Sequence, residues 1–411
     1  MQKFEKYSPV VVTEVTTKHE LRQFMQYPNR LYADNPNYIP SFYGDDLSDW
    51  TPGKNPAFDY CEARCWLARR DGEIVGRIGA ILSHKANDKF GTHRMRFSQV
   101  DFVDDSEVSA ALFGTVERWA RQKGCDQVHG PLGFTDMDRE GMLVEGFDRR
   151  SLFITNYNAP YYPEHLTRLG YRKDVDWIEY RISVPAPGSA EAERLHKLSE
   201  FILKRKHLHV ATLHHKSEYG PFVRQVFELV NAAYAPLYGV VELSDEQIER
   251  YANKFIPLVD PDFVCFVLDE QDKLVAFGVT TLDPSPALKH SDGRLFPFGW
   301  AEVLNDLHHG DTLIMLLTAV RPDLQTEGIN AVMMDHVCQS CNRHGVQFAE
   351  TGPMLELNDH ILAQWKRLEK EQHKRRRCFI KDLDHGINAA NAAAAAQAEA
   401  PEAAPAAESA E

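Results

Sequence analysis

The same series of predicted elements occurs twice in this chain of 411 residues, and this repetition limits the fold more than any other feature. In each half an amphipathic helix region precedes a strand–turn–strand hairpin, and a strand, a helix, a strand and a further helix follow it. The matching segments of the first and second halves are the helix regions Lys18–Tyr32 and Pro221–Leu237, the hairpins Cys65–Leu82 and Val264–Leu282, the strands Met95–Val103 and Leu313–Val320, the helices Glu107–Gln122 and Gln325–Arg343, the strands Asp126–Gly130 and Val346–Thr351, and the helices Tyr162–Leu169 and Asp359–Leu368. The unit predicts an α+β fold (an α/β mixed sheet flanked by helices), and the repetition predicts two such domains in tandem.

The composition changes at two places that suggest domain boundaries. Val184–Ser189 is rich in proline and glycine, which is typical of a linker. The segment from Gly386 onward is mostly Ala, Glu, Pro and Gln, and it has nothing large to bury. We therefore expect an N-terminal domain over residues 1–184, a linker over 185–190, a C-terminal domain over 191–385 and a disordered tail over 386–411.

Charge and hydropathy argue against several classes of protein. The net charge of −14 disfavours a general nucleic-acid binder, which is usually basic. No apolar run approaches the roughly 20 residues that span a bilayer, and the first residues contain no signal-peptide core. Seven cysteines scattered along a long chain indicate reduced thiols, so we expect a cytoplasmic protein.

Four residues near the end of the second half, His336, Cys338, Cys341 and His344, have the composition of a metal site. On one helix the two cysteines would share a face, but the two histidines would not both converge with them. Free cysteine is also commonly a small buried apolar residue. We therefore expect no metal.

The segment Gln325–Asn330 (QTEGIN) lies where an apolar strand passes into a predicted helix. A helix N-terminus presents unpaired N–H groups and a positive dipole end, and it therefore suits a phosphate. Gly328 would let a diphosphate approach the backbone closely, and the neutral Gln325 and Thr326 would not repel it. An ordinary strand–helix turn would explain a single glycine equally well, and the residues alone leave that alternative open.

The order of strand, [RQ]-x-x-G-x-[GA] loop and helix after a hairpin resembles the acyl-CoA pyrophosphate loop of the GNAT acyltransferase superfamily. Three longer segments are similar to a bacterial tandem-GNAT family that includes ceramide synthases, which N-acylate a sphingoid base from long-chain acyl-CoA. These segments are GPLGFTDMDREGMLVEGFD (Gly130–Asp148), YNAPYYPEHLTRLGY (Tyr157–Tyr171) and GRLFPFGW (Gly293–Trp300).

The resemblance implies acyl-CoA as co-substrate, held by the second half. It implies that the strand Leu316–Val320 is splayed from its neighbour, so that the pantetheine arm pairs with the exposed backbone. The residues expected to bind the carrier are Ala319, Val320, Arg321, Gln325, Thr326, Glu327, Gly328, Ile329, Asn330, Asn358 and Trp365. Asn330 departs from the small last residue of the motif, and Glu327 places a carboxylate near the expected diphosphate.

The corresponding junction of the first half is acidic. Asp104, Asp105 and Glu107 would cap the helix that follows but would repel a diphosphate. We therefore expect the first half to have lost the carrier site and to serve the amine substrate.

N-acylation needs a general base to take a proton from the amine. Glu356 is the first candidate and Glu350 the second, because both follow the strand Val346–Thr351, although each also fits an ordinary salt bridge. Trp365 stands where GNAT enzymes often carry a tyrosine, and an indole cannot protonate the leaving thiolate.

The first half contains a dense polar and aromatic stretch that the resemblance assigns to the amine pocket across the domain interface. Glu145 and Tyr157 are the members that we expect to take part in catalysis. The other polar and aromatic members are Asp136, Asp138, Glu140, Asp148, Asn156, Asn158, Tyr161 and Tyr162. A folded loop packed by its own tyrosines is the alternative.

Two basic segments, Lys204–His209 and Lys366–Cys378, occur in an otherwise acidic chain. A solvated face is the simplest interpretation. Contact with CoA phosphates or with an anionic membrane surface is the other, and it would make the protein peripheral on the inner face of the cytoplasmic membrane.

These features together predict an N-acyltransferase that moves an acyl group, expected to be long, from acyl-CoA to a primary amine, with a sphingoid base as the preferred candidate. Two alternatives stay open: an acetyltransferase acting on a small polar amine or peptide, and a degenerate pair of GNAT domains that binds CoA without catalysis. No nucleic-acid partner is expected, and the oligomeric state does not follow from the sequence.

Overall fold

The computed structural model describes residues 8–383, so the tail expected over 386–411 lies outside the described residues. The first half contains strands β1 (Val11–Glu14), β2 (Cys61–Arg70), β3 (Glu73–Ser83), β4 (Arg94–Phe102), β5 (Gln127–Gly130), β6 (Met142–Glu145) and β7 (Arg172–Ser183), and helices α1 (Lys18–Leu31), α2 (Tyr43–Asp49), α3 (His84–Phe90), α4 (Ser106–Gln122) and α5 (Tyr162–Arg168). The second contains strands β8 (His209–Val210), β9 (Val264–Leu268), β10 (Leu274–Leu282), β11 (Thr312–Val320), β12 (Phe348–Thr351), β13 (Met354–Leu355) and β14 (Lys370–Asp382), and helices α6 (Ala190–Lys206), α7 (Gly220–Tyr234), α8 (Asp245–Phe255), α9 (Ser285–His290), α10 (Gly299–His309), α11 (Asn330–His344) and α12 (Asp359–Ala363).

The duplicated unit is confirmed, with hairpins β2–β3 and β9–β10 followed by the parallel pairs β4–β5 and β11–β12. The helices differ from the expected ranges mainly at their ends. The helix expected from Gln325 begins at Asn330, after a short 3₁₀ turn at Pro322–Leu324, and α12 ends at Ala363 rather than Leu368. The fold is the predicted mixed sheet flanked by helices.

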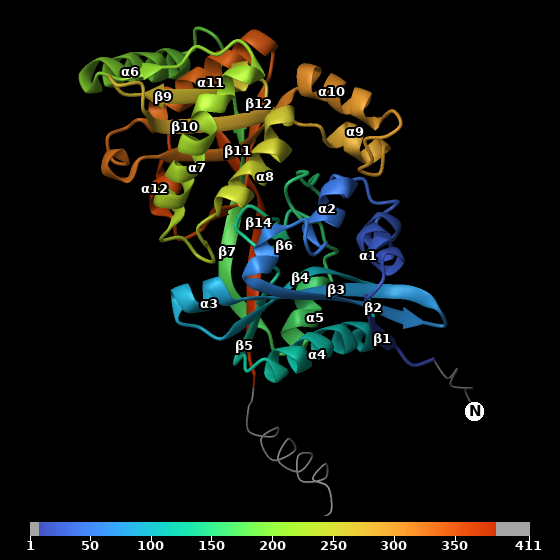
Figure 1. The fold of residues 1–411 in the computed structure, drawn as a ribbon. Helices are drawn as coiled ribbons and strands as arrows, with labels where there is room; N and C mark the ends of the chain where they lie inside the picture. Colours follow the sequence, from blue (N-terminus) through green and yellow to red (C-terminus); the bar gives the residue numbers. More distant parts are fainter. Residues whose placement is uncertain (1–7, 384–411) are drawn as a thin grey trace, which may run out of the picture.

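One sheet runs through both halves, in the order β1-β2-β3-β4-β5-β14-β7-β12-β11-β10-β9-β8. The last strand of the chain, β14, lies between β5 and β7, and β7 in turn pairs with β12 of the second half. Figure 1 shows β14, in red, running alongside β7 from one half into the other. Residues 184–189 join β7 to α6 where we expected a linker, but the sheet is not divided there.

The basic segment Lys366–Cys378 is exposed at Lys366 and Arg367, but its later part is not the solvated face that we expected. Most of it belongs to β14, where Lys374 and Arg376 have side chains only 1% and 0% exposed. Arg376 donates to Glu179 of β7 at 2.5 Å, and Lys374 donates to Glu350 of β12 at 3.2 Å. The local sequence shows the cations but not the carboxylates, which come from strands far away in the chain.

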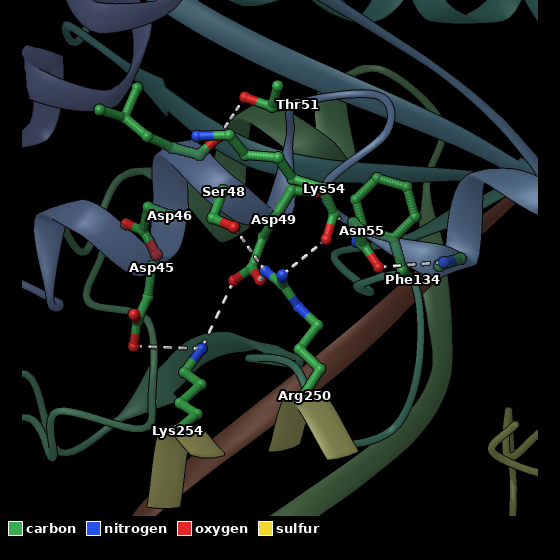
Figure 2. A network of polar contacts seen from close by, with 12 residues as sticks. Asp45, Asp46, Ser48, Asp49, Thr51, Lys54, Asn55, Phe134, Arg250 and Lys254 are labelled. Carbon is green, nitrogen blue, oxygen red and sulfur yellow. Dashed lines mark hydrogen bonds and ion pairs between the residues drawn. The ribbon is translucent and has the colours of Figure 1, made fainter. Parts of the chain in front are cut away.

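Figure 2 shows how α2 of the first half and the segment after it contact α8 of the second half. Arg250 of α8 donates to Asp49 at 2.5 Å and to Ser48 at 3.0 Å, both on α2. Lys254, one turn later on α8, lies 3.5 Å from the Asp49 carboxylate and 3.6 Å from that of Asp45. Since charged hydrogen bonds between partly buried groups resist separation, these contacts fix α8 relative to the first half.

Candidate active site

The strands β11 and β12 separate part-way along their length. They pair in parallel over Thr312–Met315, and in the part of the chain that the structure describes no strand covers that edge of β11 over residues 316–320. On the opposite edge the register with β10 slips by one residue, at Leu316. This confirms the splay expected at Leu316–Val320, where no described strand pairs with that edge of β11. The carbonyls of Thr318 and Val320 accept from the Tyr234 hydroxyl at 2.7 Å and the Gln325 amide at 3.3 Å.

The start of α11 lies directly beyond this open edge. Ile329, its N-cap residue, has no side-chain capping bond. The N–H groups of Ala331 and Val332 donate to the carbonyls of Gly328 and Ile329, each at 2.9 Å, so a ligand would meet the N–H groups that precede them. Gly328 is exposed and has a φ of 82°, a region that other residues rarely adopt. Lys206 of α6 lies 2.6 Å from the Glu327 carboxylate and lowers its pKa through that hydrogen bond, so this acidic residue is paired rather than free to repel an anion.

The first half has the same splay but a different helix start. There β4 and β5 pair only over Arg94–Arg96. The Asp105 carboxylate caps α4 by accepting from the N–H of Glu107 at 2.8 Å, and Arg70 donates to that carboxylate at 2.6 Å. A side-chain carboxylate therefore occupies the position that a diphosphate would need.

Three cavities meet at the gap between β11 and β12. One, of about 380 Å³, lies against Thr318–Val320 and the start of α11. A second, of about 260 Å³ and mostly apolar, lies beneath α7 and α8, and a third, of about 170 Å³, lies between β11 and the helices α11 and α12. Tyr234 and Pro353 line all three cavities, and the Tyr234 hydroxyl donates to the carbonyl of Thr318 at 2.7 Å.

Carboxylates of the first half reach these cavities through the loop that follows β5. Asp136 and Glu140 line both the 380 Å³ and the 260 Å³ cavities. Arg96 holds the loop by donating to the carbonyl of Gly133 at 2.8 Å, and the hydroxyls of Thr135 and Tyr251 lie 2.6 Å apart. The polar stretch expected to form an amine pocket thus does reach the domain interface, although through residues other than the two that we singled out.

Burial changes the acid–base properties of these two carboxyl groups. It raises the pKa of Asp136 to about 6. Burial, and then the neighbouring charge of Asp136, raise the pKa of Glu140 well above its usual value. Perturbed carboxyl groups in a cavity are common at functional sites.

The residues expected to bind the carrier gather around the end of β11. Ala319, Val320, Gln325, Asn330 and Asn358 line the 380 Å³ cavity, and the buried Trp365 lines the 170 Å³ cavity. The turn between β11 and α11 contains the remaining five, which are Arg321, Thr326, Glu327, Gly328 and Ile329.

The structure does not bring the two candidate bases of the second half to the cavities. Glu356 is paired with Lys173 and with Arg375, the latter at 2.8 Å. Glu350 is buried on β12 against Lys374.

The two candidates of the first half also lie elsewhere. Glu145 is 59% exposed and pairs with Arg375 at 3.2 Å. Tyr157 is buried, accepts from the Asn35 amide at 2.8 Å, and donates to the carbonyl of Phe147. Asp136 and Glu140 belong to the same stretch of the sequence as Glu145, but no local signal distinguishes them from it.

Within residues 8–383 one group of side chains has metal-ligand spacing, namely His129, Asp174 and Cys378. The Tyr238 hydroxyl donates to Asp174 at 2.5 Å and lies 3.0 Å from His129 and 3.4 Å from Cys378. A hydrogen-bond network therefore already satisfies these groups. Cys338 and Cys341, by contrast, are buried on α11 itself, and His344 pairs with Asp262.

Among the described residues no helix has the length and hydropathy of a membrane span.

No family model matches the chain. Protein YghO of Escherichia coli K12 is 27% identical over 383 residues, which are 91% of this chain and 95% of that protein. The bacterial ceramide synthase of Caulobacter vibrioides is 28% identical over 299 residues, which are 71% of this chain and 75% of that protein.

Among solved structures, a tandem GNAT protein from the clavulanic acid biosynthesis pathway, solved without AcCoA, superposes with a TM-score of 0.52. The superposition covers 91% of this chain and 99% of that protein, at 14% sequence identity. Together with the duplicated unit and the two splayed strand pairs, this likeness shows that the chain has the tandem fold of the GNAT acyltransferases.

Proposed function

We propose that the protein is an acyl-CoA-dependent N-acyltransferase that transfers a long acyl chain to a primary amine. The observation that carries this proposal is the convergence of two features on one cavity, the open edge of β11 and the uncapped start of α11. A phosphate-bearing carrier with an amide-rich arm is the kind of ligand that both features suit.

In this proposal the diphosphate lies at Gln325–Asn330, where the N–H groups and the dipole of α11 stabilise its charge. The pantetheine arm lies along residues 316–320 and pairs with their backbone. The thioester then reaches the gap beside Tyr234 and Pro353, where the cavities meet.

The length of the acyl chain is proposed from the apolar lining that adjoins this gap. The 170 Å³ cavity is bounded by Met333, Met334, Val337 and Trp365, which offer no polar partner to an acetyl or succinyl group beyond the thioester. The ceramide synthase relative makes a sphingoid base the preferred acceptor.

Thiol release measured over a matrix of acyl donors and amines tests the proposal. We expect turnover with palmitoyl-CoA and a long-chain amine to exceed turnover with acetyl-CoA and ethylamine by about a hundredfold or more, because each buried CH₂ contributes about 0.8 kcal/mol. A preference for acetyl-CoA would favour the short-chain alternative. Tight CoA binding without release of thiol for any amine would favour a binding module.

We also propose that the protein works at a lipid surface, which a long-chain substrate would require. Phe296 and Phe298 are 81% and 76% exposed between α9 and α10, and Trp300 follows them at 48%. Aromatic side chains at a surface loop suit the interface of a bilayer.

Sedimentation with vesicles of mixed neutral and anionic lipids tests this surface. The double variant F296S/F298S is expected to lose about tenfold in vesicle affinity, whereas L357S, which alters a side chain 80% exposed elsewhere, is expected to bind as before. Equal binding by both variants would rule out the α9–α10 loop as the contact.

A further inference from the structure

We propose that the apolar cavity beneath α7 and α8, closed by Asp136 and Glu140 of the first half, is the acceptor site, and that it takes an amine carried on a single long hydrocarbon tail. In this site Asp136 takes a proton from the bound ammonium group. The inference rests on the proposed acyl transfer and adds to it the place, the chemistry and the base of the second substrate.

The lining of the 260 Å³ cavity identifies the tail. Val226 and Phe227 of α7, Phe255 at the end of α8, and Val264 and Phe266 of β9 all line it. Its exposed lining is mostly apolar, apart from the carboxyl-bearing loop at one side. Such a cavity favours a hydrocarbon chain over a polar amine or a peptide.

Two carboxyl groups of the loop lack a direct ion-pair partner in the part of the chain that the structure describes, although the charge of Arg96 acts to lower the pKa of both. Within the residues that the structure describes, neither Asp136 nor Glu140 forms an ion pair, and Glu140 Oε1 is buried without a hydrogen-bond partner. Asp138 differs, because it accepts from the N–H groups of Phe134 at 2.7 Å and Thr135 at 3.2 Å and so serves the loop itself. A buried polar atom without a partner is costly, and a ligand ammonium group would satisfy it.

The position of the cavity relative to β11 brings the two substrates together. Leu316 and Leu317 line the apolar cavity, whereas Thr318–Val320 line the carrier cavity. The boundary between the two therefore falls within the splayed segment, where the thioester is proposed to lie. An amine held by Asp136 would approach the thioester from the opposite side to the carrier.

The roof of the acceptor cavity is held in place by the first half. The ion pairs of Arg250 and Lys254 with α2, seen in Figure 2, fix α8 above the cavity. The Tyr251 hydroxyl, on the same helix, contacts Thr135 at 2.6 Å at the base of the carboxyl-bearing loop. The first half thus contributes the acidic groups of the acceptor cavity and the ion pairs that hold α8 over it. These contacts give the first half a defined role, although it has no proposed carrier site.

Asp136, ionised at neutral pH, accepts one proton from the ammonium group and frees the nitrogen lone pair. The nitrogen forms a bond to the thioester carbonyl carbon, the C–S bond breaks, and the second proton of the amine goes to the departing sulfur, which leaves as a thiol. The proton on Asp136 then returns to solvent, so one proton is released for each ammonium group acylated.

The variant Asp136→Asn tests the base. With palmitoyl-CoA and dodecylamine we expect kcat to fall by about a hundredfold or more, with palmitoyl-CoA affinity unchanged within about twofold. The wild-type kcat/KM should rise with pH through about 6, where Asp136 loses its proton, and the variant should lack this rise. Asp88→Asn, which alters an exposed carboxylate on α3 outside this stretch, is the control and should behave as wild type.

Thermal unfolding of Asp136→Asn distinguishes a catalytic role of Asp136 from a structural one. The folded pKa of Asp136 lies above the unfolded value of about 3.9, so ionising it opposes folding increasingly as pH rises from about 4 through 6. At pH 7 Asp136→Asn should therefore be at least as stable as wild type, whereas a residue with a purely structural role would destabilise the protein when replaced. A fully active variant, or one inactive only because it unfolds, would overturn the assignment of the base.

The variant Val226→Trp tests the tail cavity. It should raise KM for dodecylamine by about tenfold or more relative to any change in KM for ethylamine, and calorimetry of dodecylamine with the wild-type protein should show binding without acyl-CoA. Equal effects on both amines, or no effect on either in a folded variant, would overturn the location of the acceptor. If the protein neither binds acyl-CoA nor releases thiol from it, the proposed function itself fails. If turnover in both variants equals that of wild type, only this inference fails.

Discussion

Replacing Gln325 with glutamate is expected to weaken the binding of CoA and palmitoyl-CoA by about tenfold or more. Gln325 is exposed in the turn between β11 and α11 and lines the 380 Å³ cavity, so a carboxylate there would face the proposed diphosphate. Two like charges about 6 Å apart repel by roughly 1–3 kcal/mol at a partly exposed site, and 1.4 kcal/mol is a tenfold change in affinity. The side chain makes one bond, to the carbonyl of Val320 at 3.3 Å, so little stability is lost with it.

Gly328→Val is expected to have a larger effect, with binding too weak to measure. A Cβ at this position would lie 3.1 Å from Ile202 Cδ1, and the φ of 82° is unfavourable for valine. The turn would have to shift, and the N–H groups would no longer face the carrier.

Isothermal titration of each variant with CoA and palmitoyl-CoA measures both effects. Gln271→Glu is the matched control, because it adds the same charge on the turn between β9 and β10, and its affinity should equal that of wild type. Wild-type affinity in both Gln325→Glu and Gly328→Val would show that the carrier does not use this turn.

Replacing Arg376 with methionine is expected to destabilise the whole protein by about 3–5 kcal/mol, the usual cost of removing one partner of a buried ion pair. Arg376 and Glu179 are both 0% exposed, and Arg376 also donates to the carbonyl of Asn156. Burial acts to raise the pKa of Glu179, but the charges of Arg376 and Lys374 lower it overall, so the carboxylate is held ionised by its partners. The variant would leave that carboxylate buried with Lys374 alone.

Denaturant unfolding measures this loss, and Arg367→Met is the matched control. Arg367 is exposed before β14, so its replacement should change stability by no more than about 0.5 kcal/mol. Because the pKa of Glu179 is lowered in the folded state, the stabilisation should be present above its ordinary pKa and decline as the pH falls through and below it. A wild-type unfolding midpoint for Arg376→Met would contradict a structural role for the β7–β14 pairing.

The repeated unit could be predicted because it depends on local signals. The Asp71-Gly72 turn, the apolar run ending at Val320 and the glycine at 328 each constrain the backbone within a few residues of themselves. The sequence therefore placed the segment expected to bind the carrier between a strand and a helix, and the structure brings its members around one end of β11.

The proposed general base did not follow from such local signals. Glu356 and Glu350 follow the expected strand, but Arg375 and Lys374 hold them in ion pairs. Asp136 lies in a loop of the other half, about 180 residues before the strand that it faces, and its neighbours in sequence do not indicate which carboxylate lacks a cation.

The order of hydrophobic and turn residues thus sufficed to predict the duplicated mixed-sheet unit and the glycine turn before α11, because periodicity and glycine placement act over short stretches of backbone. The exchange of β7 and β14 between halves, the burial of Lys374 and Arg376, and the unpaired state of Asp136 followed only from the folded chain. These features depend on which charges meet across strands distant in sequence, and no local pattern encodes the identity of such a partner.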